Sequence, residues 1–467
     1  MDSSIINHFK SKAATIEERI AQGKALRKKF PRISQGNYKP SPKRTDPVSI
    51  LELQGKSRLP ELVPIRYSRM LASPFAFLRG GAAVMAADLA ANNKTTGIHV
   101  QSCGDMHVAN FGVFASAERK LIFGINDFDE TLPGPWEWDL KRLVASIAVC
   151  GRFLGADDSM CREAVAAAVS SYRKHMKQYA SMGYLELWYT TITENDILVT
   201  LSSDQKSALK RITDKARERT HLQVLSKLTD LVDEKYRLRV DAPFIVRETH
   251  TQAGKPIEEA LGGLLESYML SLGDDRKALL RQYRIVDVVR KIVGVGSVGT
   301  RCWIIFLTGK SSGDPLFLQV KEAQHSVLEP FVSKSTYGNC GQRVVAGQRL
   351  IQGAPDIFLG WGEYGGFDFY LRQLRDMKGG VEFDPEKVKL RNLPLYCGLC
   401  AWALALAHAK SGDAALIAGY VGSSDELDEA MTRFAIAYAG QTEKDYKALA
   451  KAARSGRIKV SDAESKK

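Results

Sequence analysis

Apolar residues in the first half of the chain recur mainly with the spacing of helices. Between residues 66 and 92 this spacing predicts two helices, and Ser73-Pro74 marks the start of the second. Short strands are expected at 97–102 and 120–125, and a helix at 139–153. Residues 155 to about 285 are predicted to be almost wholly helical. This half should therefore form a helical lobe around a compact strand–loop–strand–loop–helix unit.

The pattern changes near residue 285, where β-branched and aromatic runs alternate with Gly/Ser turns. A small antiparallel sheet is expected, with one helix at about 342–352 inserted between its strands. The predicted strands are 286–293, 302–307, 316–321, 358–363 and 367–374. Beyond the sheet we predict a long apolar helix at 391–410 and a pair of helices within 424–455.

Length and charge suggest how these parts are organised. A chain of 467 residues exceeds the usual size of one hydrophobic core, so two lobes that share a cleft are expected. Much of the net charge of +13 lies near the ends, and the basic cluster before residue 45 has little aromatic interleaving and no nucleic-acid motif. We therefore predict no specific nucleic-acid binding. The predicted domains are a solvated basic arm (1–60), a catalytic-loop segment with the helical lobe (61–284), a β-rich lobe (285–380) and C-terminal helices that complete the helical lobe (381–467).

Composition narrows the cellular setting. No run of eighteen apolar residues occurs, so no membrane span is predicted, and the start lacks the features of a secretory signal, so we expect a cytoplasmic protein. Seven scattered cysteines do not suggest a disulfide framework. Cys397 and Cys400 form a lone C-x-x-C pair in an apolar helical pattern, which favours buried thiols over a metal or redox site.

The strongest chemical signal lies in two neighbouring loops. Asp105, His107 and Asn110 follow the first predicted strand, and Asp127 and Asp129 follow the next one. Phosphoryl transfer needs a carboxylate to orient and deprotonate a hydroxyl, together with amide and carboxylate oxygens to hold Mg²⁺. The alternative is that these residues are ordinary turn formers. We expect Asp105 to be the base, His107 to act in catalysis or to orient the loop, and Asn110, Asp127 and Asp129 to be metal ligands.

These loops resemble the H-G-D-x-H-x-x-N loop and I-D-F turn of aminoglycoside and choline phosphotransferases, which are relatives of protein kinases. Asp139-Leu140 resembles the Asp-Leu that opens the next helix in those enzymes, where the Asp braces the catalytic loop. Cys103 stands where that family usually has the first His of its loop, which puts one supporting residue in doubt. The resemblance implies ATP and Mg²⁺ as cofactors.

A second signal is the G-x-G-x-x-G stretch formed by Gly294, Gly296, Ser297 and Gly299. Because strand-like residues follow it, we predict a glycine hairpin rather than the strand-to-helix turn of a dinucleotide-binding unit. The next strand ends in Lys321, as the kinase V-A-I-K strand does, so Lys321 and the loop are expected to hold the triphosphate. The alternative is a tight hairpin with a solvated lysine.

The order of these parts is reversed relative to kinases, so the resemblance implies a circularly permuted, kinase-like fold of the α+β class. In that arrangement Gln373, Leu374 and Arg375 would offer backbone groups to adenine, and helix 391–410 would be the one that normally precedes the catalytic loop. Kinases pair the lysine with a helix glutamate, yet residues 341–353 contain no acidic residue. Glu329 is the nearest candidate.

Five stretches along the chain form a further pattern: Ile65 to Met70, Ser73 to Gly80, Cys103 to Asp105, Asn126 to Thr131 and Gly294 to Thr300. Through these residues the chain as a whole resembles a bacterial family known only as domain of unknown function 2252. The family implies no substrate. Arg79, which lies in one of these stretches, is expected either to contact phosphate or substrate or to pair with a turn carboxylate.

Together these features predict an ATP- and Mg²⁺-dependent phosphotransferase acting on an unidentified hydroxyl-bearing small molecule or protein. Two alternatives stay open. The first is a catalytically inactive nucleotide-binding regulator, because a degraded kinase could lack the helix glutamate. The second is a kinase-fold nucleotidyltransferase that binds ATP inverted.

Overall fold

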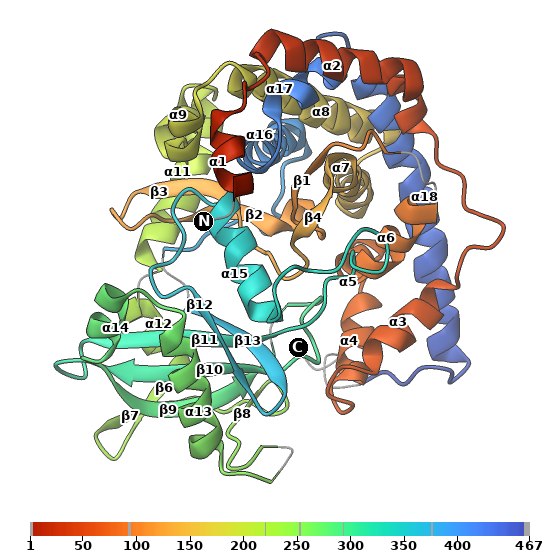
Figure 1. Ribbon diagram of the computed structural model, residues 1–467. Helices are drawn as coiled ribbons and strands as arrows, with labels where there is room; N and C mark the ends of the chain where they lie inside the picture. The colour runs from red at the N-terminus through yellow and green to blue at the C-terminus, as the bar shows by residue number, and fades with distance from the viewer. Residues whose placement is uncertain are drawn as a thin grey trace.

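The computed structural model describes residues 3–91, 95–219, 221–251, 254–292, 294–374 and 377–461. The chain is a mixed α+β protein with a sheet lobe and a larger helical lobe (Figure 1). The sheet lobe lies at the lower left of Figure 1 and the helical lobe above it, with the N-terminal helices α3–α6 along the right.

The sheet lobe is built on a six-stranded antiparallel sheet of order β12-β13-β11-β10-β9-β8. Its strands are β8 (Ile245–Val246), β9 (Arg284–Lys291), β10 (Cys302–Thr308), β11 (Pro315–Ala323), β12 (Gly360–Tyr364) and β13 (Phe367–Gln373). One helix, α15 (Cys340–Ile351), lies between β11 and β12 in sequence. The predicted hairpin around the glycine stretch is confirmed as β9 and β10, and Val293 of the predicted first strand lies outside the described residues.

Strand β11 is the central element of this lobe, because all nine of its residues are buried. Successive side chains of a strand point to opposite faces. Leu318 and Val320 join an apolar cluster with helix α13 (Ile257–Leu270), and Phe317 joins a cluster with helix α12 (His221–Leu228) on the other face. Lys321 lies on the same face as Phe317 but nearer the helical lobe, where it meets the acidic loops. Helix α14 (Asp274–Leu280) precedes β9.

The helical lobe packs around helix α16 (Leu393–Ser411), which lies against α8 (Asp158–Ala180). Residues 390–411 are long and apolar enough to cross a membrane, but half of the apolar window is buried inside the protein. Cys397 and Cys400 are buried in this helix, as the buried-thiol interpretation predicts. The other helices of the lobe are α7 (Trp136–Phe153), α9 (Tyr184–Tyr189), α10 (Glu194–Leu198), α11 (Ser203–Glu218), α17 (Ala414–Val421) and α18 (Glu426–Arg454), with the short η3 (Leu390–Asn392) before α16.

Three small sheets complete the strands. The first pairs β1 (His99–Ser102) with β4 (Leu132–Pro135). The second has β3 (Leu121–Ile125) between β2 (Phe111–Ala115) and β5 (Ile192–Thr193), and the third pairs β6 (Thr229–Val232) with β7 (Lys235–Leu238). The first two sheets bring the two acidic loops together. The backbone N–H of Asn126 donates to the carbonyl of Asn110 (2.9 Å), so the ends of both loops are adjacent.

Two predicted boundaries are wrong. Residues 221–284 were expected in the helical lobe, yet α12, α13, β7 and β8 pack on the sheet and extend the β-rich lobe toward the N-terminus. The predicted pair of helices at 424–455 is one helix of 29 residues, α18. In both places the local pattern was compatible with helices, and contacts distant in sequence decided the arrangement.

The prediction of a solvated N-terminal arm is also wrong. This segment contains α1 (Ser3–Lys10), α2 (Ile16–Lys29), η1 (Arg32–Gly36) and α3 (Pro47–Gly55), which precede α4 (Val63–Met70), α5 (Pro74–Gly80) and α6 (Ala82–Ala91). Helix α2 packs on α17, and η1 packs on α18. Arg44 forms two ion pairs, with Asp88 and with Asp445, both at 2.6 Å. The segment is therefore part of the folded body.

The contact between α2 and α17 gives a direct test of this correction. A Cβ at Gly23 would lie 2.0 Å from the Leu416 carbonyl oxygen, so Gly23→Ala should separate the two helices. We expect it to lower the free energy of unfolding by about 1–3 kcal/mol, the usual range for overpacking, in urea denaturation. Gly440→Ala is the matched control, because a Cβ there meets nothing within 4 Å and alanine favours a helix by about 1 kcal/mol. Equal effects of the two changes would contradict the packing.

Candidate active site

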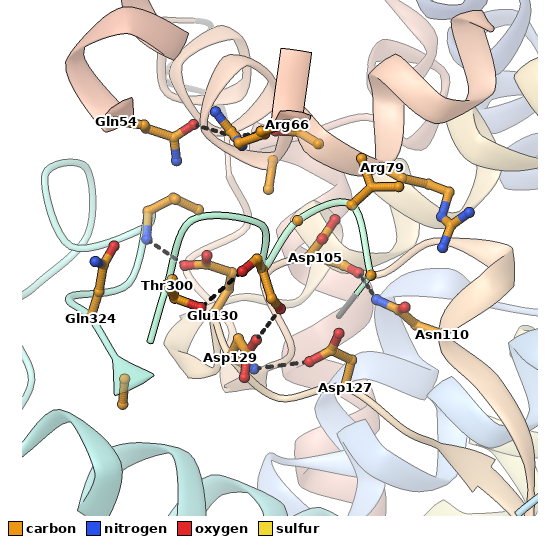
Figure 2. Close-up of a pocket in the computed structure, with 18 of the residues that line it drawn as sticks. Gln54, Arg66, Arg79, Asp105, Asn110, Asp127, Asp129, Glu130, Thr300 and Gln324 are labelled. Atoms are coloured by element: carbon orange, nitrogen blue, oxygen red, sulfur yellow. Dashed lines mark hydrogen bonds between the residues drawn. The ribbon is translucent and has the colours of Figure 1, made fainter. Parts of the chain in front are cut away.

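Two cavities lie between the lobes, one on each side of the Asp127 turn. The carboxylate cavity is lined by Asp105, Asn110, Asp127, Asp129 and Glu130, with further residues from the glycine loop and from the N-terminal helices (Figure 2). The amide cavity is lined by Asn126, Gln319, Gln348, Gln352 and Arg372, among others. Asn126 and Asp127 are consecutive, and β11 contributes Gln319 to one cavity and Glu322 to the other. One ligand could therefore extend along β11 from one cavity to the other.

The loop that begins at Cys103 is held in place by Asp139 of α7. Its carboxylate, 1% exposed, accepts hydrogen bonds from the backbone N–H groups of Cys103 (2.6 Å) and Gly104 (2.9 Å). This is the bracing role that the phosphotransferase resemblance implies. Gly104 has φ +77°, and a Cβ there would lie 2.6 Å from the Glu130 carbonyl oxygen, so only glycine fits this turn.

A buried chain of polar groups supports that brace. His408 Nε2 lies 3.4 Å from the Asp139 carboxylate, and its Nδ1 is 2.8 Å from the Tyr172 hydroxyl. His408 comes from α16 and Tyr172 from α8, so the two central helices of the lobe position the loop. Tyr396 of α16 also donates to the carbonyl of Val108, at 2.9 Å.

Asp105 has one carboxylate oxygen engaged and one available. Arg142 of α7 donates twice to Oδ1, at 2.8 and 2.6 Å, whereas Oδ2 accepts no hydrogen bond from the described residues. Burial raises the pKa of Asp105, and the neighbouring Arg142 partly offsets this. His107 Nε2 is 3.9 Å from Oδ2. Burial places the pKa of His107 well below its usual value, so its imidazole is neutral and suits an orienting role.

Asn110 and Asp127 fit the requirements of a magnesium site. The Asn110 amide nitrogen donates to the Asp105 carbonyl (2.7 Å), so the amide oxygen is left as a possible ligand, and both residues line the carboxylate cavity. Burial and the nearby Asp129 raise the pKa of Asp127, which a bound cation would counteract. Among the described residues no group of three His, Cys, Asp or Glu could hold a metal. Mg²⁺ is commonly held by one or two carboxylates plus substrate phosphates, so this donor set is sufficient.

Asp129 pairs with the lysine rather than standing free as a second metal ligand. Lys321 Nζ lies 2.7 Å from Asp129 Oδ2, and the Tyr370 hydroxyl donates to Oδ1 at 2.6 Å. Ser297 Oγ also donates to Oδ2, at 3.2 Å. Burial alone would raise the pKa of Asp129, but Lys321 and Tyr370 outweigh it and lower the pKa to about 2. Both groups are thus charged in the cleft.

The provisional partner Glu329 is wrong, because its carboxylate lies beside His325, at 2.9 Å from Nδ1. Helix α15, the next helix after the lysine strand, presents Arg343, which donates to the carbonyls of Asp129 (2.8 Å) and Thr131 (2.6 Å). An arginine there holds the backbone of the acidic turn. Lys321 therefore pairs with Asp129 of the turn and not with a helix carboxylate.

The glycine loop forms one wall of the carboxylate cavity. Gly294, Gly296 and Ser297 line it. Gly294 and Gly299 have positive φ values of +61° and +94°, which glycine adopts without strain. The loop is also tied to the N-terminal helices, since the Gly299 carbonyl accepts from the N–H of Leu59 at 2.8 Å.

Gln373 and Leu374 line the amide cavity, where adenine was expected. Their backbone donors are already used: the N–H of Gln373 donates to the Asp356 carboxylate, and that of Leu374 to the Phe317 carbonyl (2.8 Å). These two N–H groups are therefore already paired, and the expectation that Gln373 and Leu374 offer backbone groups to adenine stays a prediction for their carbonyl groups. The third residue of the prediction, Arg375, lies outside the described residues. Side-chain amides dominate the cavity instead, and buried Gln348 keeps an unpartnered Oε1.

Several site residues escaped the sequence interpretation. Arg142 is one, although it lies three residues after Asp139 in the same helix and so faces the same side. Tyr370 is another, and its register opposite Lys321 on the neighbouring strand could have suggested it. Arg58 and Arg66 also line the carboxylate cavity, and only the tertiary structure reveals this.

Comparison with known proteins gives a family and no function. No curated protein and no solved structure matches the chain. A family model described as "Uncharacterized protein conserved in bacteria (DUF2252)" matches residues 58–452. The match includes every site residue discussed above, from Arg58 to His408. This chain therefore belongs to the DUF2252 family.

Proposed function

We propose that this protein is an ATP- and Mg²⁺-dependent phosphotransferase with a circularly permuted, kinase-like fold. The observation that carries the proposal is the ion pair between Lys321 and Asp129, whose residues lie 192 positions apart. It joins the strand after the glycine hairpin to the turn that follows the catalytic loop. In kinases the corresponding elements act on the phosphates of one nucleotide, the lysine directly and the turn carboxylate through Mg²⁺.

The arrangement of elements supports the same proposal. In protein kinases the glycine loop joins two strands and the lysine lies on the third. Here β9 and β10 flank the glycine loop, Lys321 lies on β11, and one helix follows before the next strand. Helix α16 packs against β1, the strand that precedes the catalytic loop, as expected of the helix that comes before that loop in an unpermuted chain.

The side chains fit in-line transfer of the γ-phosphoryl group. In the proposed reaction, the acceptor hydroxyl lies against Asp105 Oδ2, and its oxygen attacks the γ-phosphorus. As the new P–O bond forms and the bond to ADP breaks, the hydroxyl proton passes to Asp105. Lys321 and the glycine-loop amides hold the phosphates. Mg²⁺ held by Asn110 and Asp127 would neutralise phosphate charge when bound.

The amide cavity is the proposed position of the adenine ring. Gln348 Oε1 is a buried acceptor without a partner, and an exocyclic amino group could donate to it. Gln352, by contrast, already donates to the Ile125 carbonyl (2.7 Å) and accepts from Gln348. In this proposal base recognition uses side-chain amides in place of the backbone donors that Asp356 and Phe317 occupy.

A second candidate, nucleotidyl transfer, is favoured by arginines on the far side of the glycine loop. Arg58, Arg66 and Arg79 line the carboxylate cavity and could hold the terminal phosphates of an inverted ATP. In that case the α-phosphorus, rather than the γ-phosphorus, would lie near Asp105.

The test uses purified protein, Mg²⁺ and ATP labelled in parallel at the γ- or the α-position, with pools of metabolites and proteins as acceptors. We expect Mg²⁺-dependent transfer of the γ-label. Transfer of the α-label would establish the second candidate instead. ATP binding without transfer of either label would point to a regulator, and no ATP binding would contradict the kinase-like assignment.

A further inference from the structure

Three arginines from the N-terminal helices face the carboxylate cavity. We call residues 47–80, which contain α3, α4 and α5, the cap. Arg58 lies between α3 and α4, Arg66 in α4 and Arg79 in α5, and all three line the cavity. Figure 2 shows Arg66 and Arg79 on the side of the cavity away from Asp127 and Asp129.

These arginines are unusual because the carboxylates near Arg58 and Arg79 do not come close enough to form ion pairs with them. Among the described residues none of the three forms an ion pair. Arg66 is 1% exposed, yet it donates only to the Gly80 carbonyl (2.8 Å) and to the Gln54 side chain (3.2 Å). Its Nε and Nη1 have no partner, and neither do Nε of Arg58 and Nε of Arg79. A buried charge without a counter-ion is costly, so a missing anion is the economical explanation.

The carboxylates nearby are already committed to other groups. Asp105 binds Arg142, Asp129 binds Lys321, and Glu322 binds Arg301 at 3.0 Å. Glu130 accepts from the N–H of Val327 (2.8 Å). The positive charge of the cap is therefore available to a ligand.

Guanidinium groups match phosphate oxygens in geometry and form strong, charge-assisted hydrogen bonds with them. In the proposed function, Lys321 and the glycine loop bind the nucleotide phosphates. The backbone of Arg79 lies next to that loop, since a Cβ built on Gly296 would be 3.6 Å from the Arg79 carbonyl oxygen. Arg79 also lies near enough to Asp105 for their charges to interact. An anion on the cap arginines would thus sit beside the base, on the acceptor side.

We propose that Arg58, Arg66 and Arg79 form a subsite for a phosphate-type oxyanion carried by the acceptor, so that the acceptor is a phosphorylated hydroxyl compound. This rests on the proposed function for its location beside Asp105. The same chemistry could come from the terminal phosphate of ATP, and the experiment separates these two sources.

The probe is inorganic phosphate, titrated calorimetrically into the full chain with and without saturating Mg²⁺ and a non-hydrolysable ATP analogue. We expect phosphate to bind in both conditions. Arg66→Met and Arg79→Gln should each weaken phosphate binding at least tenfold, because each removes charge-assisted hydrogen bonds, while leaving the affinity for the analogue within about threefold. Arg79→Gln provides a second test in case the variant at the more deeply buried Arg66 does not fold. Lys56→Met, which removes an exposed positive charge from the cap outside the cavity, is the matched control and should bind phosphate normally.

The other outcomes are decisive. Loss of phosphate binding when the analogue is present would assign the arginines to ATP and overturn the acceptor subsite. Absence of phosphate binding, or equal weakening by Lys56→Met, would overturn it as well. If phosphate binds but the ATP analogue does not, the oxyanion site stands and the proposed function fails.

Discussion

Replacing Lys321 by methionine is expected to destabilise the protein by about 1–3 kcal/mol, because it removes the buried cation that pairs with the Asp129 carboxylate. The Lys321 side chain is only 4% exposed, whereas Asp129 is 28% exposed and keeps its hydrogen bonds from Tyr370 and Ser297, which offset part of the loss. Urea denaturation measures this change as a lower midpoint. The same variant should bind ATP at least tenfold more weakly, since it lacks the phosphate contact.

The double variant Lys321→Met/Asp129→Asn separates structure from function. It removes both charges, so most of the stability should return, whereas ATP binding should stay weak. Asp129→Asn alone should destabilise, because it leaves Lys321 buried and unpaired. If the double variant recovered ATP binding along with stability, Lys321 would be a structural residue only.

The same ion pair has a pH signature. The pKa of Asp129 is lowered to about 2 in the folded chain, below the ordinary value of about 3.9. The carboxylate therefore stabilises the fold above pH of about 4, and this contribution is lost as pH falls through about 2. The double variant should lack this acid-dependent component.

Much of the site could be predicted because its parts are local in sequence. Asp105 and Asn110 share one short loop before β2, and Asp127 follows β3, which pairs with β2. The antiparallel pairing of β2 and β3 places the end of the Asp105 loop beside the start of the Asp127 turn, so residues of one sequence motif lie close together in the fold. Lys321 was recognisable in the same way, as the polar end of an apolar strand that follows a glycine hairpin.

The partners of these residues could not be predicted, because they come from distant parts of the chain. Asp129 was expected to bind metal, and only the packing of β13 and β11 against the turn shows that it binds Tyr370 and Lys321. Arg58 and Arg66 lie in a charge-rich segment, and such segments are usually solvated. Their burial depends on α3 and α4 closing over the glycine loop, which no local pattern reports.

The extent of the sheet lobe was missed for a related reason. Strands β6, β7 and β8 have two to four residues, too few to display an alternating pattern. Helices α12 and α13 have helical spacing, which predicts the element but not the lobe against which it packs. Tertiary contacts with Val289 and Ile305 decide that, and they lie outside any sequence window.

We propose Asp105 as the base of the phosphoryl transfer reaction. The most direct measurement is the rate of γ-label transfer from ATP by the wild-type protein and by Asp105→Asn, at saturating Mg²⁺ and ATP. Asparagine keeps an acceptor oxygen for Arg142 but cannot take the hydroxyl proton. We predict a rate at least 100-fold lower, in the range for loss of a general base, with ATP affinity unchanged within about threefold. An Asp105→Asn protein that binds ATP and transfers the label at the wild-type rate would contradict the role of Asp105 as the base.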